Sequence, residues 1–154
     1  MSNLTGGGRR VLPPVYFLGA LLLMVGLHVA FPARQVIQFP YRYSGLVPVL
    51  GGILLVLWAV RLFGQAGTPI KPFQEASALV ARGPYRLTRN PMYVGMVGVL
   101  CGIAVLLGSL APFLIIPLFG ALLDVRFIRV EEAALERVFG ARYRDYKARV
   151  RRWL

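Results

Sequence analysis

The chain has 154 residues, of which 57% are hydrophobic, and it carries a formal net charge of +12. This combination argues against an ordinary soluble domain and against a nucleic-acid binder, which would not contain long uncharged apolar runs; it is typical of a single multi-span membrane domain. One cysteine, Cys101, rules out an internal disulfide, and with a single histidine it makes a His/Cys zinc site improbable, so no metal is expected.

Two apolar runs in the first half of the chain predict transmembrane helices. Residues 11–31 carry no full charge and are long enough to cross about 30 Å of hydrocarbon. Basic residues before this run resemble those of a signal peptide, but no small-residue cleavage site follows, so the helix is expected to be retained. His28, near its far end, is expected to be structural rather than catalytic. The second run covers residues 46–63, where Gly51-Gly52 would let another helix approach closely.

The longest uncharged stretch predicts a helical hairpin. Residues 90–123 contain no charged side chain, and one helix of that length would extend about 51 Å, too far for a single crossing. Gly108-Ser109 in the middle of the stretch is typical of a turn. The prediction is therefore two further membrane helices, at residues 91–107 and 110–128.

Basic residues are distributed unevenly about these four helices. Sixteen of the 18 Lys and Arg residues fall on one predicted side of the membrane, and only Arg34 and Arg42 fall on the other. Because basic segments stay in the cytoplasm, both termini are expected there, in a multi-pass protein of the cell (inner) membrane. The cytoplasmic face would consist of a loop at residues 64–90 and an amphipathic helix at residues 129–154, which Gly140 could divide. The predicted fold class is an all-α integral membrane protein.

A basic, proline-containing loop runs into the third predicted helix at residues 83–95 (GPYRLTRNPMYVG). Asn90 is a good N-cap and Pro91 suits the first helical position, so a helix should begin here. The free N–H groups of a helix N-terminus, with arginines just upstream, would bind a carboxylate or phosphate at the membrane edge. These arginines are Arg82, Arg86 and Arg89. They could instead act only as a positive-inside anchor, and both interpretations are open at this point.

Acidic residues follow the uncharged hairpin. Asp124 is the first of them, and an ionisable group near the end of a membrane helix indicates a functional site. If the helix continues, Glu131 shares a face with Asp124 and Leu135, so its carboxylate needs a partner. That partner could be an arginine in a salt bridge: Arg86, Arg89, Arg126 or Arg129. Alternatively, Glu131 and Glu132 could bind a polar, partly cationic ligand at the membrane surface.

Three glycines, Gly95, Gly98 and Gly102, share one face of the third predicted helix. Small residues allow another backbone or a flat ligand to approach closely, and helix packing is the more common of these two uses. The chain shows no Ser-His-Asp or Cys-His arrangement and no phosphate-binding glycine loop of the usual kinds, so hydrolytic chemistry is not expected.

Two motifs of the chain resemble one protein family. The first contains Gly-Pro-Tyr-Arg at residues 83–86 and Arg-Asn-Pro-Met-Tyr at residues 89–93. The second contains Glu131-Glu132 followed by Leu135, Phe139-Gly140, Tyr143 and Tyr146. In this order around a helical hairpin, they are similar to the isoprenylcysteine carboxyl methyltransferase and phospholipid methyltransferase family of integral membrane enzymes. The resemblance covers roughly half of the chain, and Asn90 stands where the isoprenylcysteine enzymes have histidine, which leaves the acceptor open.

This resemblance implies that S-adenosylmethionine binds from the cytosol and that its methyl group passes to a hydrophobic, lipid-like acceptor from the bilayer. It implies a cofactor site formed by the first motif, the helix after it and the acidic motif: Tyr85, Arg89, Asn90, Pro91, Tyr93, Gly95, Gly98, Glu131, Glu132, Tyr143 and Tyr146. Arg89 and Glu131 are the predicted catalytic residues. The methylated atom (oxygen, nitrogen or sulfur) and the oligomeric state are left open.

The chemistry of this cofactor suits the residue types in the two motifs. A helix N-terminus with arginines suits a carboxylate, and acidic side chains suit an ammonium group or ribose hydroxyls. Two alternatives to methyl transfer are a non-catalytic membrane scaffold that binds anionic lipid and a nicotinamide-dependent membrane reductase, for which the chain is short. Membrane lipids are expected partners, and nucleic acid is not.

Overall fold

The computed structural model describes residues 12–31, 35–68 and 76–154, and within them the chain is all-α. The α-helices are α1 (Pro13–Ala30), α2 (Leu46–Gln65), α3 (Pro91–Leu107), α4 (Ile115–Leu123), α5 (Arg129–Phe139) and α6 (Ala141–Arg149). The described residues contain two isolated β-bridges and no β-strand. Residues 1–11, Arg34 and part of the predicted loop at residues 64–90 lie outside the described ranges.

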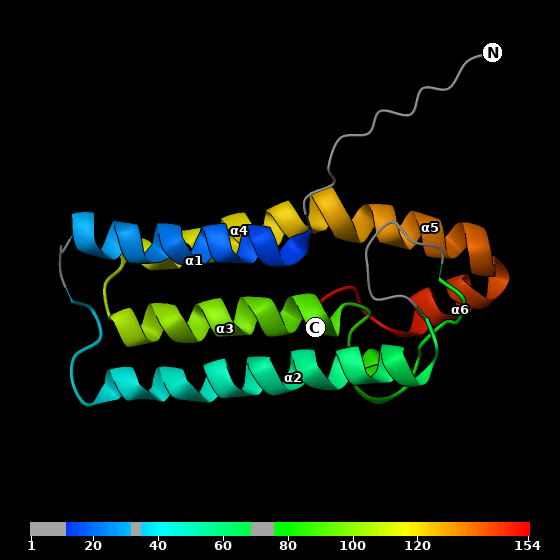
Figure 1. Cartoon of the computed structure of the whole chain (residues 1–154), viewed down its shortest axis with the longest axis horizontal. Helices are drawn as coiled ribbons and strands as arrows, with labels where there is room; N and C mark the ends of the chain where they lie inside the picture. Colours follow the sequence, from blue (N-terminus) through cyan, green and yellow to red (C-terminus); the bar gives the residue numbers. More distant parts are fainter. Residues whose placement is uncertain (1–11, 32–34, 69–75) are drawn as a thin grey trace, which may run out of the picture.

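Successive long helices run in opposite directions. Helix α3 lies between α2 on one side and the pair α1 and α4 on the other (Figure 1). Among the described residues, three helical segments are long and apolar enough to cross a membrane: Pro13–Ala30, Tyr41–Gln65 and Ala111–Phe139. Helix α3 is apolar but has only 17 residues, about 25 Å. The protein is therefore a multi-pass membrane protein. A fourth crossing and the cytoplasmic position of the termini stay predictions.

Short non-α turns connect the helices and shape their ends. Three are 3₁₀-helices: η1 (Tyr41–Gly45), η2 (Gly83–Arg86) and η3 (Ala111–Leu114). The fourth, η4 (Asp124–Ile128), is a π-helical turn that joins α4 to α5 without a break. The helical hairpin expected from the sequence is present, because α3 ends at Gly108, whose φ of 73° closes the helix in the left-handed region.

The C-terminal segment is divided at Gly140, as considered for the helix predicted at residues 129–154, but its helical part ends at Arg149 rather than at the last residue. Helix α5 continues the segment that begins with η3 and ends at Gly140, which has a φ of 52°. Helix α6 then runs in a new direction and ends at Arg149 (Figure 1). Residues 150–154 are extended and pair with the loop before α3 through a bridge between Thr88 and Arg151. This long-range pairing offers more hydrogen bonds than another frayed helical turn would.

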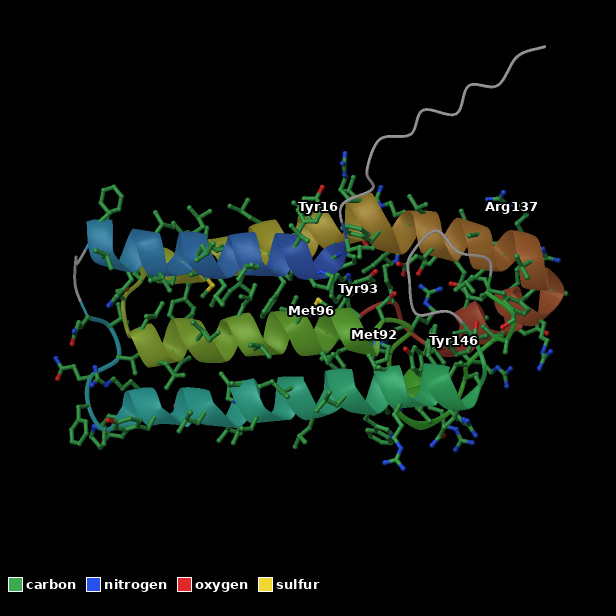
Figure 2. All side chains as sticks on the ribbon, in the orientation of Figure 1. Tyr16, Met92, Tyr93, Met96, Arg137 and Tyr146 are labelled. Carbon is green, nitrogen blue, oxygen red and sulfur yellow. The ribbon has the colours of Figure 1, made fainter. Side chains whose placement is uncertain are left out.

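Two ends of the bundle can be distinguished. The charged end comprises the N-termini of α1 and α3, the C-terminus of α2, and α5 with α6, where most nitrogen-bearing side chains gather (Figure 2). At the far end, His28 on α1 lies 2.7 Å, Nδ1 to Oγ, from the buried Ser109 in the turn after α3. That contact gives His28 a structural partner at the end of the molecule opposite α5 and α6.

Candidate functional site

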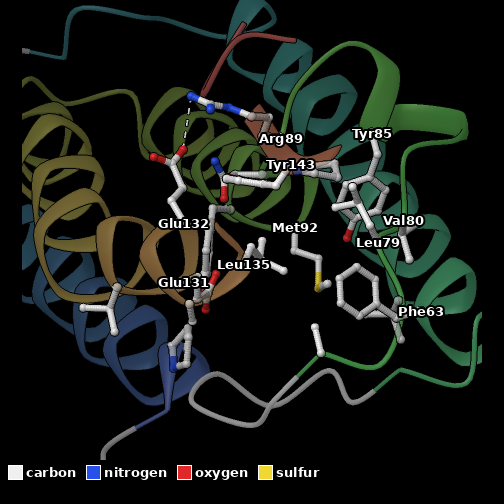
Figure 3. Close-up of a pocket in the computed structure, with 18 of the residues that line it drawn as sticks. Phe63, Leu79, Val80, Tyr85, Arg89, Met92, Glu131, Glu132, Leu135 and Tyr143 are labelled. Carbon is white, nitrogen blue, oxygen red and sulfur yellow. Dashed lines mark hydrogen bonds and ion pairs between the residues drawn. The ribbon is translucent and has the colours of Figure 1, made fainter. Parts of the chain in front are cut away.

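A cavity of about 690 Å³ lies at the charged end of the bundle, with walls from α1, α2, α3, α5, α6 and the loop before α3 (Figure 3). Its volume falls in the range of pockets that enclose small molecules. One wall is apolar and consists of Val56, Val60 and Phe63 from α2 with Met92 and Met96 from α3. The opposite walls carry the polar residues of the two sequence motifs. The cavity therefore has an apolar part and a polar part in contact with each other.

The acidic pair at the start of α5 has two different environments. Glu131 lines the cavity, and its Oε1 accepts a 2.6 Å hydrogen bond from the Tyr93 hydroxyl on α3. Among the described residues it makes no ion pair, so the salt bridge considered for it from the sequence is not found there. Glu132 is more deeply buried, with a side chain 8% exposed, and it does have arginine partners. The neighbouring acids thus have different roles in the structure.

Glu132 is the centre of a buried ion network. Arg89 Nη2 lies 3.1 Å from its Oε1, and the Arg89 side chain is 9% exposed. Arg152 donates from Nε to Oε1 at 3.1 Å and from Nη2 to Oε2 at 2.7 Å, while its Nη1 reaches Asp124 Oδ1 at 3.1 Å. These bonds raise the pKa of the Arg152 guanidinium. The π-helical turn η4 turns Asp124 toward this network, and such turns often occur at functional sites.

Several buried polar atoms around the cavity have no hydrogen-bond partner among the described residues: Tyr85 Oη, Tyr143 Oη, Arg89 Nε and Arg89 Nη1. All three residues line the cavity. Leaving a buried donor without a partner costs about 1–3 kcal/mol, and more for a charged group, so such atoms call for an explanation. Their common position makes the cavity the place where a polar ligand would satisfy them.

The tyrosine hydroxyls at this site stay protonated. Burial raises the pKa of Tyr143 to about 12, with a further contribution from the negative charge of Glu132. Burial, followed by the proximity of Tyr146 and Glu131, also raises the pKa of Tyr85. Both hydroxyls can therefore donate hydrogen bonds at any physiological pH. Tyr146 is already engaged, because its hydroxyl donates to the Tyr85 carbonyl oxygen at 2.6 Å.

Asn90 precedes α3 as expected, but its side chain makes no capping hydrogen bond to the helix. Its Nδ2 instead donates to the Arg152 carbonyl oxygen at 2.9 Å, and its backbone N–H donates to Thr88 Oγ1 at 3.1 Å. The N-cap role predicted for the Asn90 side chain is therefore wrong. The amide binds the returning C-terminal segment, which competes with the helix for it.

A model of the family described as Phospholipid methyltransferase matches residues 40–142, about two thirds of the chain. The chain belongs to the phospholipid methyltransferase family. This confirms the family resemblance inferred from the motifs. A search of curated proteins finds no match.

One solved structure has a similar fold. It is described as the eukaryotic intramembrane Ras methyltransferase ICMT (isoprenylcysteine carboxyl methyltransferase) without a monobody. The two share 22% sequence identity and a TM-score of 0.67, over 97% of this chain and 52% of that one. At this identity the likeness establishes the fold, and this family member spans about half the length of its structural neighbour.

The structure gathers most of the predicted site residues around the cavity. Its lining includes Tyr85, Arg89, Asn90, Pro91, Tyr93, Glu131, Glu132, Tyr143 and Tyr146. Gly95 and Gly98 lie elsewhere, at the contact of α3 with α2: a Cβ on Gly95 would meet Val56 and Gly52, and one on Gly98 would meet Pro48 and Gly52.

Sequence reasoning did not assign Arg152 to the site, nor the apolar wall that includes Phe63 and Met92. Met92 lies inside the first motif, so its position was available as a signal. Arg152 was only one of many arginines in a segment expected to be helical. Nothing in its local sequence indicates a contact with an acid twenty residues earlier.

Proposed function

We propose that this protein transfers a methyl group from S-adenosylmethionine to a lipid or lipidated acceptor at the cytoplasmic face of the membrane. Family membership supports the reaction class. The observation that carries the proposal is a set of donors without partners among the described residues, on Tyr85, Arg89 and Tyr143, which all line a cavity with an adjoining apolar wall. The uneven distribution of basic residues supports the cytoplasmic orientation and four crossings, with α3 as the short one.

The residues present suit the groups of this cofactor. Arg89 offers Nε and Nη1 as two separate donors on either side of the Nη2 that contacts Glu132, and a carboxylate can accept a charge-assisted hydrogen bond from one of them. Glu131 offers acceptor oxygens to an ammonium group or to ribose hydroxyls, and the two tyrosine hydroxyls offer further donors. When bound, S-adenosylmethionine would supply a methyl group on a sulfonium. Its leaving group would be the neutral thioether, S-adenosylhomocysteine.

The protein's own contribution would be positioning and exclusion of water. The apolar wall formed by Phe63, Met92 and Met96 can hold the hydrophobic part of an acceptor beside the polar groups. Held geometry and a dry site can account for several orders of magnitude of rate in a displacement reaction. Glu131, with Tyr93 orienting its carboxylate, would take a proton if the acceptor is an amine; a carboxylate acceptor needs no base.

Calorimetry on the detergent-purified protein tests the cofactor. Micromolar binding of S-adenosylmethionine and S-adenosylhomocysteine without binding of NADPH is expected. NADPH binding alone would favour the reductase, and binding of none would favour the lipid-binding scaffold. Transfer of a labelled methyl group into total lipid extract, followed by mass spectrometry, then identifies the acceptor.

The acceptor class can be checked with a matched pair of variants. Glu131→Gln removes the cavity carboxylate, whereas Glu136→Gln removes one that pairs with Lys147 on the surface. A fall of methyl transfer by about hundredfold or more in the first variant only, measured at saturating S-adenosylmethionine, would indicate an amine acceptor, because general-base catalysis is worth about that much. Equal rates in the two variants would indicate an acceptor that needs no base.

A further inference from the structure

The extended segment at residues 150–154 returns from α6 to the loop that holds Arg89. The Arg89 backbone N–H donates to the Arg151 carbonyl oxygen at 2.9 Å. On either side of it, Thr88 Oγ1 and Asn90 Nδ2 both donate to the Arg152 carbonyl oxygen, at 3.1 and 2.9 Å. The main chain of this segment therefore holds the residue before Arg89, the residue after it and Arg89 itself.

The Arg152 side chain then engages the acid that Arg89 also contacts. Its two bonds to Glu132 occupy both carboxylate oxygens, and its third nitrogen binds Asp124. Arg89 reaches Glu132 through Nη2 alone, at 3.1 Å, which leaves its Nε and Nη1 without partners among the described residues. Two arginines thus share one buried carboxylate unequally.

This unequal sharing has a physical consequence. Without Arg152, Glu132 Oε2 would be buried without a partner, and a buried carboxylate in that state attracts any nearby guanidinium strongly. Arg89 is the nearest, and a two-pronged pairing with Glu132 would add Nε or Nη1, which have no partner among the described residues, to the contact that Nη2 already makes. Arg152 prevents this pairing because its guanidinium already bonds to both oxygens of the Glu132 carboxylate.

We propose that Arg152 is a positioning residue: by occupying Glu132 it keeps Arg89 Nε and Nη1 available to the carboxylate of the bound cofactor. The inference rests on the proposed function, because it assigns that carboxylate to Arg89. It explains why Asn90 uses its amide on the Arg152 carbonyl rather than on the helix. It also makes the last residues of the described chain part of the site, although they do not line the cavity.

Trp153 provides a means to observe this segment directly. It is partly buried against the core residues of α3 and α4, next to Arg152 in the chain. The other tryptophan, Trp58, is half exposed on α2. In a Trp58→Phe background, quenching of Trp153 fluorescence by acrylamide reports whether residues 150–154 are docked, with no ligand present.

The test compares two ligands that differ only in the carboxylate, S-adenosylhomocysteine and its decarboxylated analogue, by calorimetry on the full chain in detergent. Arg152→Gln should weaken the first about tenfold or more and the second by less than about twofold. Arg152→Lys, which keeps the charge but not the fork, should recover part of the loss. Arg149→Gln, an exposed arginine of α6, is the matched control and should leave both affinities unchanged.

The outcomes separate this inference from the function on which it rests. If the unmodified protein binds neither ligand, the proposed function fails and the role of Arg152 falls with it. If the unmodified protein binds both, and Arg152→Gln weakens them equally, only the positioning role is overturned. Greater quenching of Trp153 alongside that equal loss would identify Arg152 as a structural tie for residues 150–154.

Discussion

Helix α3 has two sides that are built in different ways. The side toward α2 is made of small residues in direct backbone contact, as where Gly95 meets Gly52 and Gly102 meets Gly45. The end toward α5 and α6 is made of large and charged side chains, such as Tyr93 and the neighbouring Arg89, and it encloses a cavity. Both sides are largely buried, yet only the second leaves polar atoms without partners among the described residues.

The difference indicates what each side is for. Glycine contacts leave no space for a ligand and suit helix association in a membrane, where close van der Waals packing replaces the hydrophobic effect. Buried donors without a partner lower stability. Their presence together at one place therefore indicates a use other than stability, such as binding a ligand. The α2 side of α3 therefore suits helix packing, and the charged end is the side to which the proposed function assigns binding.

The largest expected effect comes from Arg89→Ala. This change removes the two Arg89 nitrogens that have no partner among the described residues, and hydrogen bonds to charged groups are worth about 1.5–3 kcal/mol. The affinity for S-adenosylhomocysteine should therefore fall about hundredfold, as measured by calorimetry. The protein should still fold, because Glu132 retains Arg152 as its partner.

Arg86→Ala is the matched control for that change. Arg86 lies three residues earlier in the same loop and is exposed, so its loss should alter the affinity by less than about twofold. Equal losses for the two variants would mean that the loop attracts the ligand through its overall charge. The distinction between the two sides of α3 would then lose its main support.

Gly95→Ala addresses the α2 side. A Cβ at this position would lie 2.6 Å from Val56 Cγ2 and 2.7 Å from the Gly52 carbonyl oxygen, so the helices must separate. Overpacking of this kind costs about 1–3 kcal/mol, which should appear as a lower free energy of unfolding in detergent. Gly51→Ala, on the same helix as Gly52 but with open space around it, should be neutral or slightly stabilising. If Gly95→Ala lost cofactor affinity with unchanged stability, the prediction from the sequence that Gly95 belongs to the cofactor site would be supported instead.

The sequence allowed the family, the helical class and most of the polar residues that line the cavity to be predicted. Asn90-Pro91 places the start of α3, and Gly108 its end, because helix termini have local rules. The roles of Glu131 and Glu132 could not be assigned, since adjacent residues point about 100° apart and small changes in helix geometry exchange their environments. The π-helical turn η4 is such a change, and its position was not evident from the residues.

The contact of residues 150–154 with the loop before α3 was also beyond prediction. It joins segments about sixty residues apart, and all three of its hydrogen bonds end on backbone carbonyl oxygens of Arg151 and Arg152, which carry no sequence signature. Periodicity alone favoured continuing the helix through Val150 and Trp153, and tertiary hydrogen bonding overrode it. The ion network around Glu132 depends on this contact, so the network could not be foreseen either.

The smallest expected effect separates two tyrosines of α6 that the sequence treats alike. Tyr143→Phe removes a buried hydroxyl without a partner among the described residues, so the free energy of unfolding should stay the same or rise slightly. Ligand affinity should fall about three- to tenfold if that hydroxyl donates to the cofactor. Because the pKa of Tyr143 is raised to about 12, its hydroxyl stays protonated well below that pH. The loss of affinity should therefore be constant between about pH 6 and pH 9.

Tyr146→Phe should show the opposite pattern. Its hydroxyl donates to the buried Tyr85 carbonyl oxygen at 2.6 Å, and losing that bond should lower the free energy of unfolding by about 1 kcal/mol. The affinity of the folded protein should change little, because Tyr146 acts on the fold of the loop and not on the ligand. If both variants lost stability equally and neither lost affinity, the Tyr143 hydroxyl would stabilise the fold, as that of Tyr146 does, and would not donate to the ligand. Of the polar groups assigned to the cofactor, Arg89 and Glu131 would then be the ones that remain.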